Sequence, residues 1–312
     1  MSESALLKPP AVAPGAGIRI IAPASFARPD RVEEGLRSLR ELGYEPSLSK
    51  SAHMRGPLFF AGTAGQRLTD LHSAFADDSA AMAMCVRGGY GSNYLLNGLN
   101  LDLIRAHPKP LFAYSDLTGV QLRLLDQVGL PAFHGPMAAA DFASENGVHP
   151  GSFEAAIRGK TYSVGATEGM RVLKAGSARG TLYGGCLSIL VSLLGTPWEP
   201  VTEGKLLFLE DTGAKPYQID RMLWQLRAAR KLRDIRGVIF GEMLDCASPG
   251  ADPSLLEQVI LQAFDDFDGP VAFGLRSGHV SRENVTLTFG VEAELRAGND
   301  AELRLLEPAV AA

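Results

Sequence analysis

Short apolar runs alternate with amphipathic stretches along the first 135 residues. The apolar runs predict buried strands at 18–22 (IRIIA), 81–86 (AMAMCV), 110–114 (PLFAY) and 131–134 (PAFH). Between these runs, apolar side chains recur at helical spacing, which predicts helices at 31–42, 66–75 and 117–128. Because strands alternate with helices, the pattern predicts a parallel, doubly wound sheet.

The pattern changes at about residue 140. Residues 141–179 contain scattered Gly, Lys and Thr with weak periodicity, and we predict a linker there. It would join an N-terminal domain, 15–140, to a C-terminal domain, 180–312. In the second half the pattern predicts helices at 185–194 and 219–232 and strands at 205–209 and 237–240. After His279, apolar and polar residues alternate, which indicates antiparallel strands and a β-rich domain.

Composition narrows the class of protein. Hydrophobic residues make up 46% of the 312 and charged residues 21%, which argues against disorder. A net charge of -5 without a basic run disfavours nucleic acid or a membrane surface as partner. No apolar stretch reaches membrane-spanning length. The first residues, MSESALLKPPAVAPGAG, lack the pattern of a secretory signal, and the three cysteines form no disulfide framework. We therefore expect a cytoplasmic protein with a short flexible leader.

Ser115 stands where a predicted strand (LFAY) ends and a predicted helix (DLTGVQLRLLDQ) begins. A serine on such a turn projects from the edge of a sheet, beside the free N–H groups and positive dipole of the helix start. Those donors suit a nucleophile, because they stabilise the oxyanion of a tetrahedral intermediate. The segment AYSDL does not match the G-x-S-x-G pattern of α/β-hydrolases. Capping of the helix by Ser115 or Asp116 is the alternative interpretation.

Residues 87–91 read RGGYG and follow the predicted strand at 81–86. Glycine lets the backbone turn sharply and approach a ligand closely. Gly89 and Gly91 fit the first two positions of the dinucleotide fingerprint G-x-G-x-x-G, but Tyr94 occupies the third. The segment otherwise joins a strand to a helix without a ligand, or it offers N–H groups of 88–91 to a reacting carbonyl. All three interpretations remain open from these residues.

A serine nucleophile needs a general base, and histidine is the usual one. Of the six histidines, His134 follows a predicted strand in FHGP, and His279 lies in the turn RSGHVSREN. Position alone does not choose between them. Glu210 and Asp211 end the strand KLLFL, and a carboxylate there faces the crevice of an open α/β sheet. Such a carboxylate would hold an imidazole in one tautomer, or it would bind backbone N–H groups of its loop.

Other catalytic chemistries have weaker support. The sequence contains no HExxH, no CxxC and no histidine pair with ligand spacing, so we expect no metal. Cys186, in GGCLS before a predicted helix, is a rival nucleophile. An apolar, helix-packed thiol is more often inert core than a reactive group.

Taken in chain order, these segments resemble the LD-carboxypeptidase family. RGGYG is followed by YSD, HGP, GG-x-L-x-x-L-x-x-L-x-GTP and LED, and finally by GH before the β-rich tail. The resemblance covers residues 18–290. The family contains murein tetrapeptide carboxypeptidases and, as a sister branch, microcin C immunity peptidases. It implies a Rossmann-like parallel-sheet N-terminal domain that carries the nucleophile, and a β-rich α/β C-terminal domain.

The resemblance also implies a catalytic triad. The serine of YSD corresponds to Ser115, the glutamate of LED to Glu210 and the histidine of GH to His279. It implies a serine hydrolase without a cofactor, and a homodimer, since dimers are usual in the family. The substrate would be a murein tetrapeptide, which loses its terminal D-Ala by hydrolysis of an L,D-peptide bond in peptidoglycan recycling.

Further site residues follow from the same resemblance. The oxyanion donors would be backbone N–H groups near Gly88, Gly89 and Asp116. Arg87 and Tyr90, in the same turn, are our candidates for substrate binding, with Arg87 holding the terminal carboxylate or else forming a structural ion pair.

Three residues depart from the family pattern. Ala113 stands before YSD where Gly is common, Cys186 stands in the Asn position of GGN, and Thr288 replaces a Pro in the tail. Cys186 puts the fine specificity in question.

Three alternative functions are kept. The first is an immunity-type peptidase acting on a peptidyl-nucleotide, which would need extra aromatic residues for base stacking. Trp198 and Trp224, the only tryptophans, look like core or helix residues. The second is a nucleotide-binding oxidoreductase, and the third is a non-catalytic muropeptide-binding module.

Overall fold

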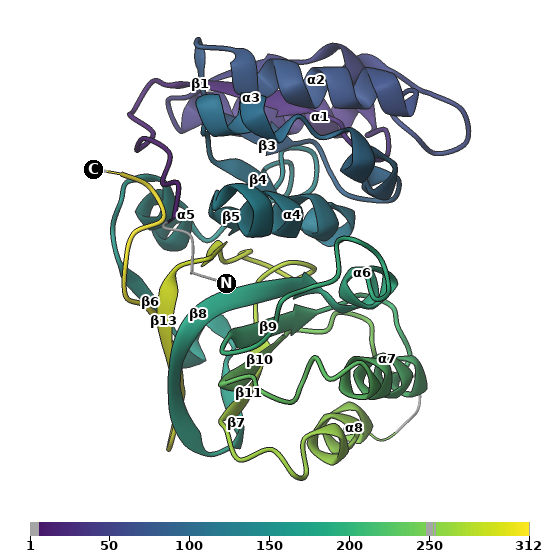
Figure 1. The fold of residues 1–312 in the computed structure, drawn as a ribbon. Helices are drawn as coiled ribbons and strands as arrows, with labels where there is room; N and C mark the ends of the chain where they lie inside the picture. Colours follow the sequence, from purple (N-terminus) through teal and green to yellow (C-terminus); the bar gives the residue numbers. More distant parts are fainter. Residues whose placement is uncertain (1–5, 248–251, 253, 312) are drawn as a thin grey trace. The chain divides into compact units, whose positions relative to one another are not determined.

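Two β-sheets organise the chain, one in each of two units (Figure 1). This computed structural model describes residues 6–247, 252 and 254–311. The first unit holds the described residues up to Lys160, Arg282–Gly290 and the described residues from Pro308 on. The second unit holds the described residues of Thr161–Ser281 together with Val291–Glu307. Each unit is therefore built from segments that are far apart in the sequence.

The sheet of the first unit has six strands in the order β12-β5-β4-β3-β1-β2. They are β1 (Gly17–Ile21), β2 (Glu45–Leu48), β3 (Ala80–Cys85), β4 (Leu111–Ala113), β5 (Ala132–His134) and β12 (Leu287–Phe289). Strands β1 to β5 are parallel, and β12 pairs antiparallel with β5. The four apolar runs of the first half thus form strands, and because most of their residues are buried, they lack a regular polar alternation.

The helices of the first unit follow the predicted alternation. They are α1 (Pro29–Glu41), α2 (Ala64–Ala76), α3 (Leu101–Ala106), α4 (Thr118–Val128) and α5 (Pro150–Ile157), with 3-10 turns η1 (Lys50–His53), η2 (Ser92–Gly98) and η3 (Ser115–Leu117). Helix α1 begins at Pro29, whose fixed φ suits a first helical position. Helix α2 begins with a capping box between Thr63 and Gln66.

The sheet of the second unit has eight strands in the order β6-β14-β13-β8-β9-β10-β11-β7. They are β6 (Tyr162–Val164), β7 (Arg171–Lys174), β8 (Gly176–Cys186), β9 (Leu206–Glu210), β10 (Gly237–Gly241), β11 (Val271–Leu275), β13 (Glu292–Ala297) and β14 (Ala301–Leu305). Strands β8 to β11 are parallel, whereas β6, β7, β13 and β14 pair antiparallel. Helices α6 (Leu187–Ser192), α7 (Pro216–Ala228) and α8 (Leu255–Ala263) complete the unit, with the 3-10 turn η4 (Ala166–Glu168).

The predicted fold class is confirmed: a parallel-sheet α/β unit is joined to a β-rich α/β unit. The division of the chain differs from the expected one at 141–179. That segment contains α5, β6, β7 and the start of β8 rather than an irregular linker. The short strands β6 and β7 lie at the two edges of the second sheet, so each is defined by one partner strand rather than by a strong pattern of its own.

The helix predicted at 185–194 begins later than expected. Strand β8 runs to Cys186, and α6 starts only at Leu187. The reason is the approach of β9: a Cβ on Gly184 would lie 1.9 Å from the carbonyl oxygen of Phe208. Gly184 and Gly185 have φ of 139° and 136°, so glycine is what allows the strand to continue there.

The tail after His279 is divided between the two sheets. Strands β13 and β14 form the expected antiparallel pair in the second sheet. Strand β12, however, adds to the first sheet beside β5. An alternating pattern predicts a strand but does not say which sheet it joins, so this part of the predicted C-terminal domain belongs to the first unit.

The leader is bound to the first unit from residue 6 on, which contradicts the predicted flexibility for those residues. Leu7 donates its N–H to the Gly129 carbonyl (2.9 Å), and Val12 donates to that of Ile157 (2.9 Å). The Val12 side chain is fully buried, which offsets the entropy of ordering this segment. Residues 1–5, where the leader begins, lie outside the described residues.

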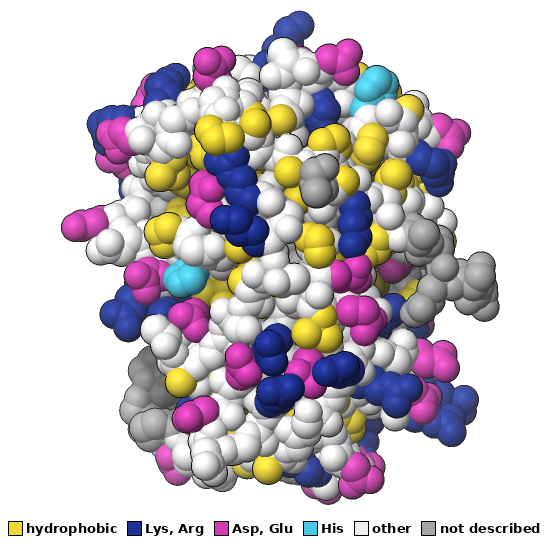
Figure 2. Space-filling model, turned by 90° about the vertical axis from the view of Figure 1, so that its left-hand side faces the viewer, with side chains coloured by type: hydrophobic (Ala, Val, Ile, Leu, Met, Phe, Trp, Pro, Cys, Tyr) yellow, Lys and Arg dark blue, Asp and Glu magenta, His cyan; other side chains and the backbone are white. Residues whose placement is uncertain are grey.

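Figure 2 shows one face of the molecule, on which acidic and basic side chains are interspersed with apolar ones. Within the part of the chain that the structure describes, no helix combines the length and apolarity needed to cross a membrane.

Candidate active site

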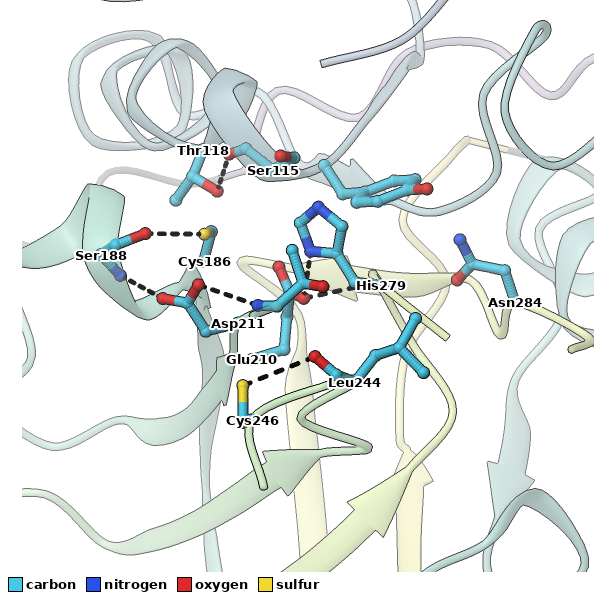
Figure 3. A network of polar contacts seen from close by, with 12 residues as sticks. Ser115, Thr118, Cys186, Ser188, Glu210, Asp211, Leu244, Cys246, His279 and Asn284 are labelled. Atoms are coloured by element: carbon cyan, nitrogen blue, oxygen red, sulfur yellow. Dashed lines mark hydrogen bonds and ion pairs between the residues drawn. The ribbon is translucent and has the colours of Figure 1, made fainter. Parts of the chain in front are cut away.

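Ser115 lies on a strained turn between β4 and α4. Its φ is 64°, in the left-handed region that a residue with a Cβ enters at a cost of roughly 1 kcal/mol. The hydroxyl of Thr118 donates to the Ser115 carbonyl at 2.8 Å and braces the turn (Figure 3). A strained strand-to-helix turn of this kind is the backbone arrangement of a nucleophile elbow, although the local sequence lacks its usual pattern.

Gly88 packs directly against Ser115. A Cβ on Gly88 would lie 2.8 Å from Ser115 Cβ, 3.0 Å from Ser115 Oγ and 3.4 Å from the main-chain nitrogen of Asp116. Only a residue without a side chain allows the RGGYG turn to approach so closely. The structure thus brings together Gly88 and Asp116, two of the three predicted oxyanion residues, at the predicted nucleophile. The third, Gly89, has a φ of 99°, and its Cβ position faces Ser25 instead.

Ser25 holds the RGGYG turn in place. Its N–H donates to the Gly88 carbonyl at 3.3 Å, and its Oγ accepts the N–H of Tyr90 at 3.1 Å. Sequence reasoning did not select this residue. The available signal was its position in APAS, immediately after the first strand, where the carboxyl ends of parallel strands meet at one edge of a sheet.

Two buried charged residues, Asp116 and Arg67, form hydrogen bonds with the main chain around the same turn. The Asp116 carboxylate accepts the N–H of Ser92 at 2.7 Å. Arg67, only 2% exposed, donates to the carbonyls of Pro23 (2.6 Å) and Gly91 (2.8 Å). Burial raises the pKa of Asp116, whereas the Ser92 N–H and the positive charge of Arg67 lower it. The sequence pattern places Arg67 inside a predicted helix, and only the packing of the folded unit shows that it binds the main chain at Pro23 and Gly91.

Arg87 and Tyr90 border this turn. Arg87 is exposed. Tyr90 is 41% exposed and belongs to an aromatic cluster, with ring centroids 5.4 Å from Phe59 and 6.2 Å from Tyr94. Both positions are accessible, as a substrate-binding role would require.

Glu210 and His279 form a close pair in the second unit. His279 Nδ1 lies 2.7 Å from Glu210 Oε2, and the main-chain N–H of His279 donates to the same oxygen at 3.0 Å (Figure 3). Glu210 ends β9 and is fully buried, while the His279 side chain is 21% exposed. An ionised carboxylate only accepts hydrogen bonds, so with Glu210 ionised this contact requires a proton on Nδ1, and in the neutral imidazole Nε2 is then the acceptor.

Asp211, the other carboxylate of LED, is bound by main-chain donors. It accepts the N–H groups of Ser188 and Thr212, each at 2.8 Å, and thereby caps the start of α6. Burial raises its pKa, and the Ser188 and Thr212 N–H groups oppose that shift. Of the two carboxylates that end the strand, only Glu210 is therefore placed to orient His279.

His134, the other candidate base, lies in the core of the first unit. It is fully buried in β5, with its ring 5.8 Å from that of Tyr114 and 5.2 Å from that of Phe289. A general base must reach a substrate, and the partly exposed His279 meets that condition better than a fully buried ring.

Cys186 is opposite Glu210, at the end of β8. Burial, followed by the negative charges of Glu210 and Asp211, raises the pKa of this thiol well above its usual value. The thiolate is the nucleophilic form of cysteine. A buried thiol held neutral in this way is a poor rival to Ser115. Among the residues described, no cluster of potential ligands suits a metal ion.

Two family models match the chain: the LD-carboxypeptidase N-terminal domain at residues 18–135 and the C-terminal domain at 179–295. A probable murein peptide carboxypeptidase of Bacillus subtilis is 37% identical over 295 residues, covering 92% of this chain and 91% of the relative. The murein tetrapeptide carboxypeptidase of Pseudomonas aeruginosa is 32% identical over 295 residues, covering 89% and 92%.

Solved structures agree with this match. An MccF-like protein from Bacillus anthracis has a TM-score of 0.87 at 24% identity, covers 96% of this chain and 99% of its own, and shows the fold. A muramoyltetrapeptide carboxypeptidase from Oxalobacter formigenes has a TM-score of 0.82 at 26% identity, covering 95% and 100%. These matches place the chain among carboxypeptidases of mixed α/β fold. It belongs to the LD-carboxypeptidase family.

This membership argues against the oxidoreductase alternative, and the glycine turn agrees. RGGYG leads into η2, a 3-10 turn, and not into the α-helix whose N-terminus holds a dinucleotide phosphate.

Proposed function

We propose that this chain is a serine carboxypeptidase that releases the terminal D-Ala of murein tetrapeptides by hydrolysing an L,D-peptide bond, in peptidoglycan recycling. The observation that carries the proposal is the strained Ser115 turn against Gly88, in a chain of the LD-carboxypeptidase family. Two of its relatives are named as murein peptide and murein tetrapeptide carboxypeptidases.

In the proposed mechanism, Ser115 Oγ attacks the scissile carbonyl while His279 Nε2 takes its proton. Glu210 holds the imidazole through Nδ1 and stabilises the imidazolium. His279 then protonates the leaving D-Ala, and water hydrolyses the acyl-enzyme by the reverse proton transfers. The mechanism requires that the two units bring Ser115 Oγ within hydrogen-bonding reach of His279 Nε2.

Main-chain donors of the first unit would stabilise the oxyanion. The N–H groups of Gly88, Gly89 and Asp116 are the proposed donors, and the close packing of Gly88 on Ser115 supports the first and third. Arg87 is proposed to bind the terminal carboxylate, and Tyr90 to contact the peptide. No cofactor takes part.

Mass spectrometry of a tetrapeptide muropeptide after incubation with the protein tests this function. We expect a product lighter by one alanine residue with wild type, and none with Ser115→Ala. Turnover of a peptidyl-nucleotide without any tetrapeptide cleavage would favour the immunity-type peptidase. Retained muropeptide binding with no hydrolysis at all would favour the non-catalytic module.

The triad itself predicts a pattern among variants. Ser115→Ala, Glu210→Gln and His279→Ala should each fold and lower kcat by about 10³-fold or more, and double variants should lose little beyond the worst single one, because triad members act as a unit. Steady-state kinetics with circular dichroism on each variant checks this. An inactive His134→Ala beside a fully active His279→Ala would contradict the assignment of the base.

Two properties of the whole protein belong to the same proposal. We expect a homodimer and a cytoplasmic location, in keeping with the family and with a substrate that arises from recycled cell wall. Light scattering of the purified protein should give twice the monomer mass.

A further inference from the structure

Two glycines enclose the Glu210 side chain within the second unit. Gly241 ends β10, the strand beside β9, and a Cβ there would lie 2.6 Å from Glu210 Cβ. Gly278 precedes His279, and a Cβ there would lie 2.6 Å from Glu210 Cδ and 2.8 Å from Oε2. The fully buried glutamate thus occupies space that a side chain at either position would need.

The oxygen nearest to Gly278 is the one that binds His279 twice. Glu210 Oε2 contacts His279 Nδ1 at 2.7 Å and accepts the His279 N–H at 3.0 Å. Gly278 has a φ of 90°, in the left-handed region. This conformation carries the main chain across the carboxylate, so that the next N–H and the next side chain both reach Oε2.

We propose that Gly278 is a positioning residue: the absence of a side chain at 278 lets the Glu210 carboxylate lie where it orients the His279 imidazole. The catalytic consequence rests on the proposed function, whereas the structural claim concerns only the Glu210–His279 contact. Gly241 packs against the base of the same side chain, at Glu210 Cβ, and not against the carboxylate.

The atoms that a side chain at 278 would meet belong to the end of a side chain, not to the main chain. A methyl group there is therefore expected to rotate the carboxylate away from His279 without disrupting the sheet. The imidazole would lose the contact that fixes its tautomer and orientation, and the fold would persist. Loss of the Glu210–His279 contact in a folded variant would distinguish a positioning role of Gly278 from a merely structural one.

Gly278→Ala should lower kcat by about 10²-fold, the order expected for a displacement of about 1 Å in a catalytic group, with KM nearly unchanged. Gly204→Ala is the matched control. Gly204 has a similar positive φ of 73°, but a Cβ there meets nothing within 4 Å. The control carries the backbone strain without the clash, and it should keep wild-type kcat.

A double-mutant cycle gives the sharper test. In the wild-type background Glu210→Gln should cost about 10⁴-fold, as expected for an imidazole left in the wrong tautomer. In the Gly278→Ala background the same change should cost far less, because the contact is already lost. Additive losses, or a Gly278→Ala variant with wild-type kcat, would overturn the proposal.

A readout without substrate separates this inference from the proposed function. In nitrogen-15 histidine NMR, the hydrogen-bonded Nδ1 proton of His279 should give a downfield resonance that is absent in His279→Ala. It should persist in Ser115→Ala and Gly204→Ala and disappear in Gly278→Ala. Persistence in Gly278→Ala refutes the positioning role, whatever the enzyme hydrolyses. If wild type fails to cleave tetrapeptide while the resonance behaves as expected, only the proposed function fails.

Should Gly278→Ala fold poorly, Gly241→Ala is the second variant, because a Cβ there would lie 2.6 Å from Glu210 Cβ and would displace the same side chain at its base. Gly241 lacks the positive φ, so this variant carries no comparable backbone strain. Loss of the resonance in folded Gly241→Ala supports the enclosure of Glu210, and its retention overturns it.

Discussion

Ser115 adopts a backbone conformation that most residues with a side chain avoid, so the strain lies at the residue proposed as the nucleophile. Glycine enters this region without penalty. Ser115→Gly should therefore be more stable than Ser115→Ala by about 1 kcal/mol, with both variants inactive. Urea unfolding checks the order. At Ser177, an exposed position in the regular strand β8, the order should reverse, because glycine weakens a strand. Equal stability of the two Ser115 variants would contradict the strain.

The protonation state of the Cys186 thiol gives a second prediction for a single residue. Burial raises the pKa of its thiol well above the usual value, so at pH 8 the group remains protonated in the folded protein. Iodoacetamide should label Cys186 slowly in native protein and rapidly in urea, where the pKa returns to its ordinary range. Peptide mass spectrometry measures both rates. Rapid native labelling that abolishes activity would revive Cys186 as a nucleophile.

At the scale of elements, one buried side chain anchors the segment that leads into β12. Asn284 Nδ2 donates to the Asp141 carboxylate at 3.0 Å, and its main chain bonds Gly147 and His149. Asn284→Ala should lower the free energy of unfolding by about 1–3 kcal/mol, because a buried carboxylate loses a donor. Arg282→Ala, at an exposed position two residues earlier, should change it by less than about 0.5 kcal/mol. Denaturant titration of both variants measures the two changes in the free energy of unfolding. Equal changes would mean that Asn284 does not anchor the strand.

The elements also show where local pattern succeeds. The runs that form β1, β3, β4 and β5 are mostly apolar, with Arg19 and His134 as the exceptions, and such a composition predicts strands that are largely buried on both faces. Strands β6 and β7 were missed within 141–179, because edge strands of three or four residues carry too short a pattern. The helix expected from residue 185 began two residues late, because the contact of Gly184 with β9 is not visible in the local sequence.

At the scale of the whole molecule, the proposed reaction needs two fixed points on the substrate. The oxyanion donors and Ser115 would fix the scissile carbonyl, and Arg87 would fix the terminal carboxylate. Only one configuration at the last α-carbon satisfies both, so D-Ala should be released rapidly and L-Ala from the L,L analogue slowly. Amidation of the terminal carboxyl should slow release strongly as well. Chromatographic assay of free alanine on the three substrates measures this. Comparable rates would leave only a generic serine hydrolase.

Sequence patterns likewise predicted some residues of the proposed site and not others. Ser115, Glu210 and His279 were selected because each stands in a short segment whose residues and order resemble a family. Ser25, Arg67 and Gly278 were not selected. Each acts through a partner that is distant in the sequence, such as Ser25 on Tyr90 or Gly278 on Glu210.

Local patterns in the chain are enough to predict the class of fold, the family and the segments that carry the proposed chemistry. These follow from periodicity, turn residues and motif order, which are properties of neighbouring residues. The folded chain is needed to show that β12 joins the first sheet, that Gly88 packs on Ser115 and that Gly278 packs on Glu210. The physical reason is that such contacts depend on strand order and on the approach of one main chain to another. Both arise only when segments as far apart as residues 88 and 115, or 210 and 278, are packed into one unit.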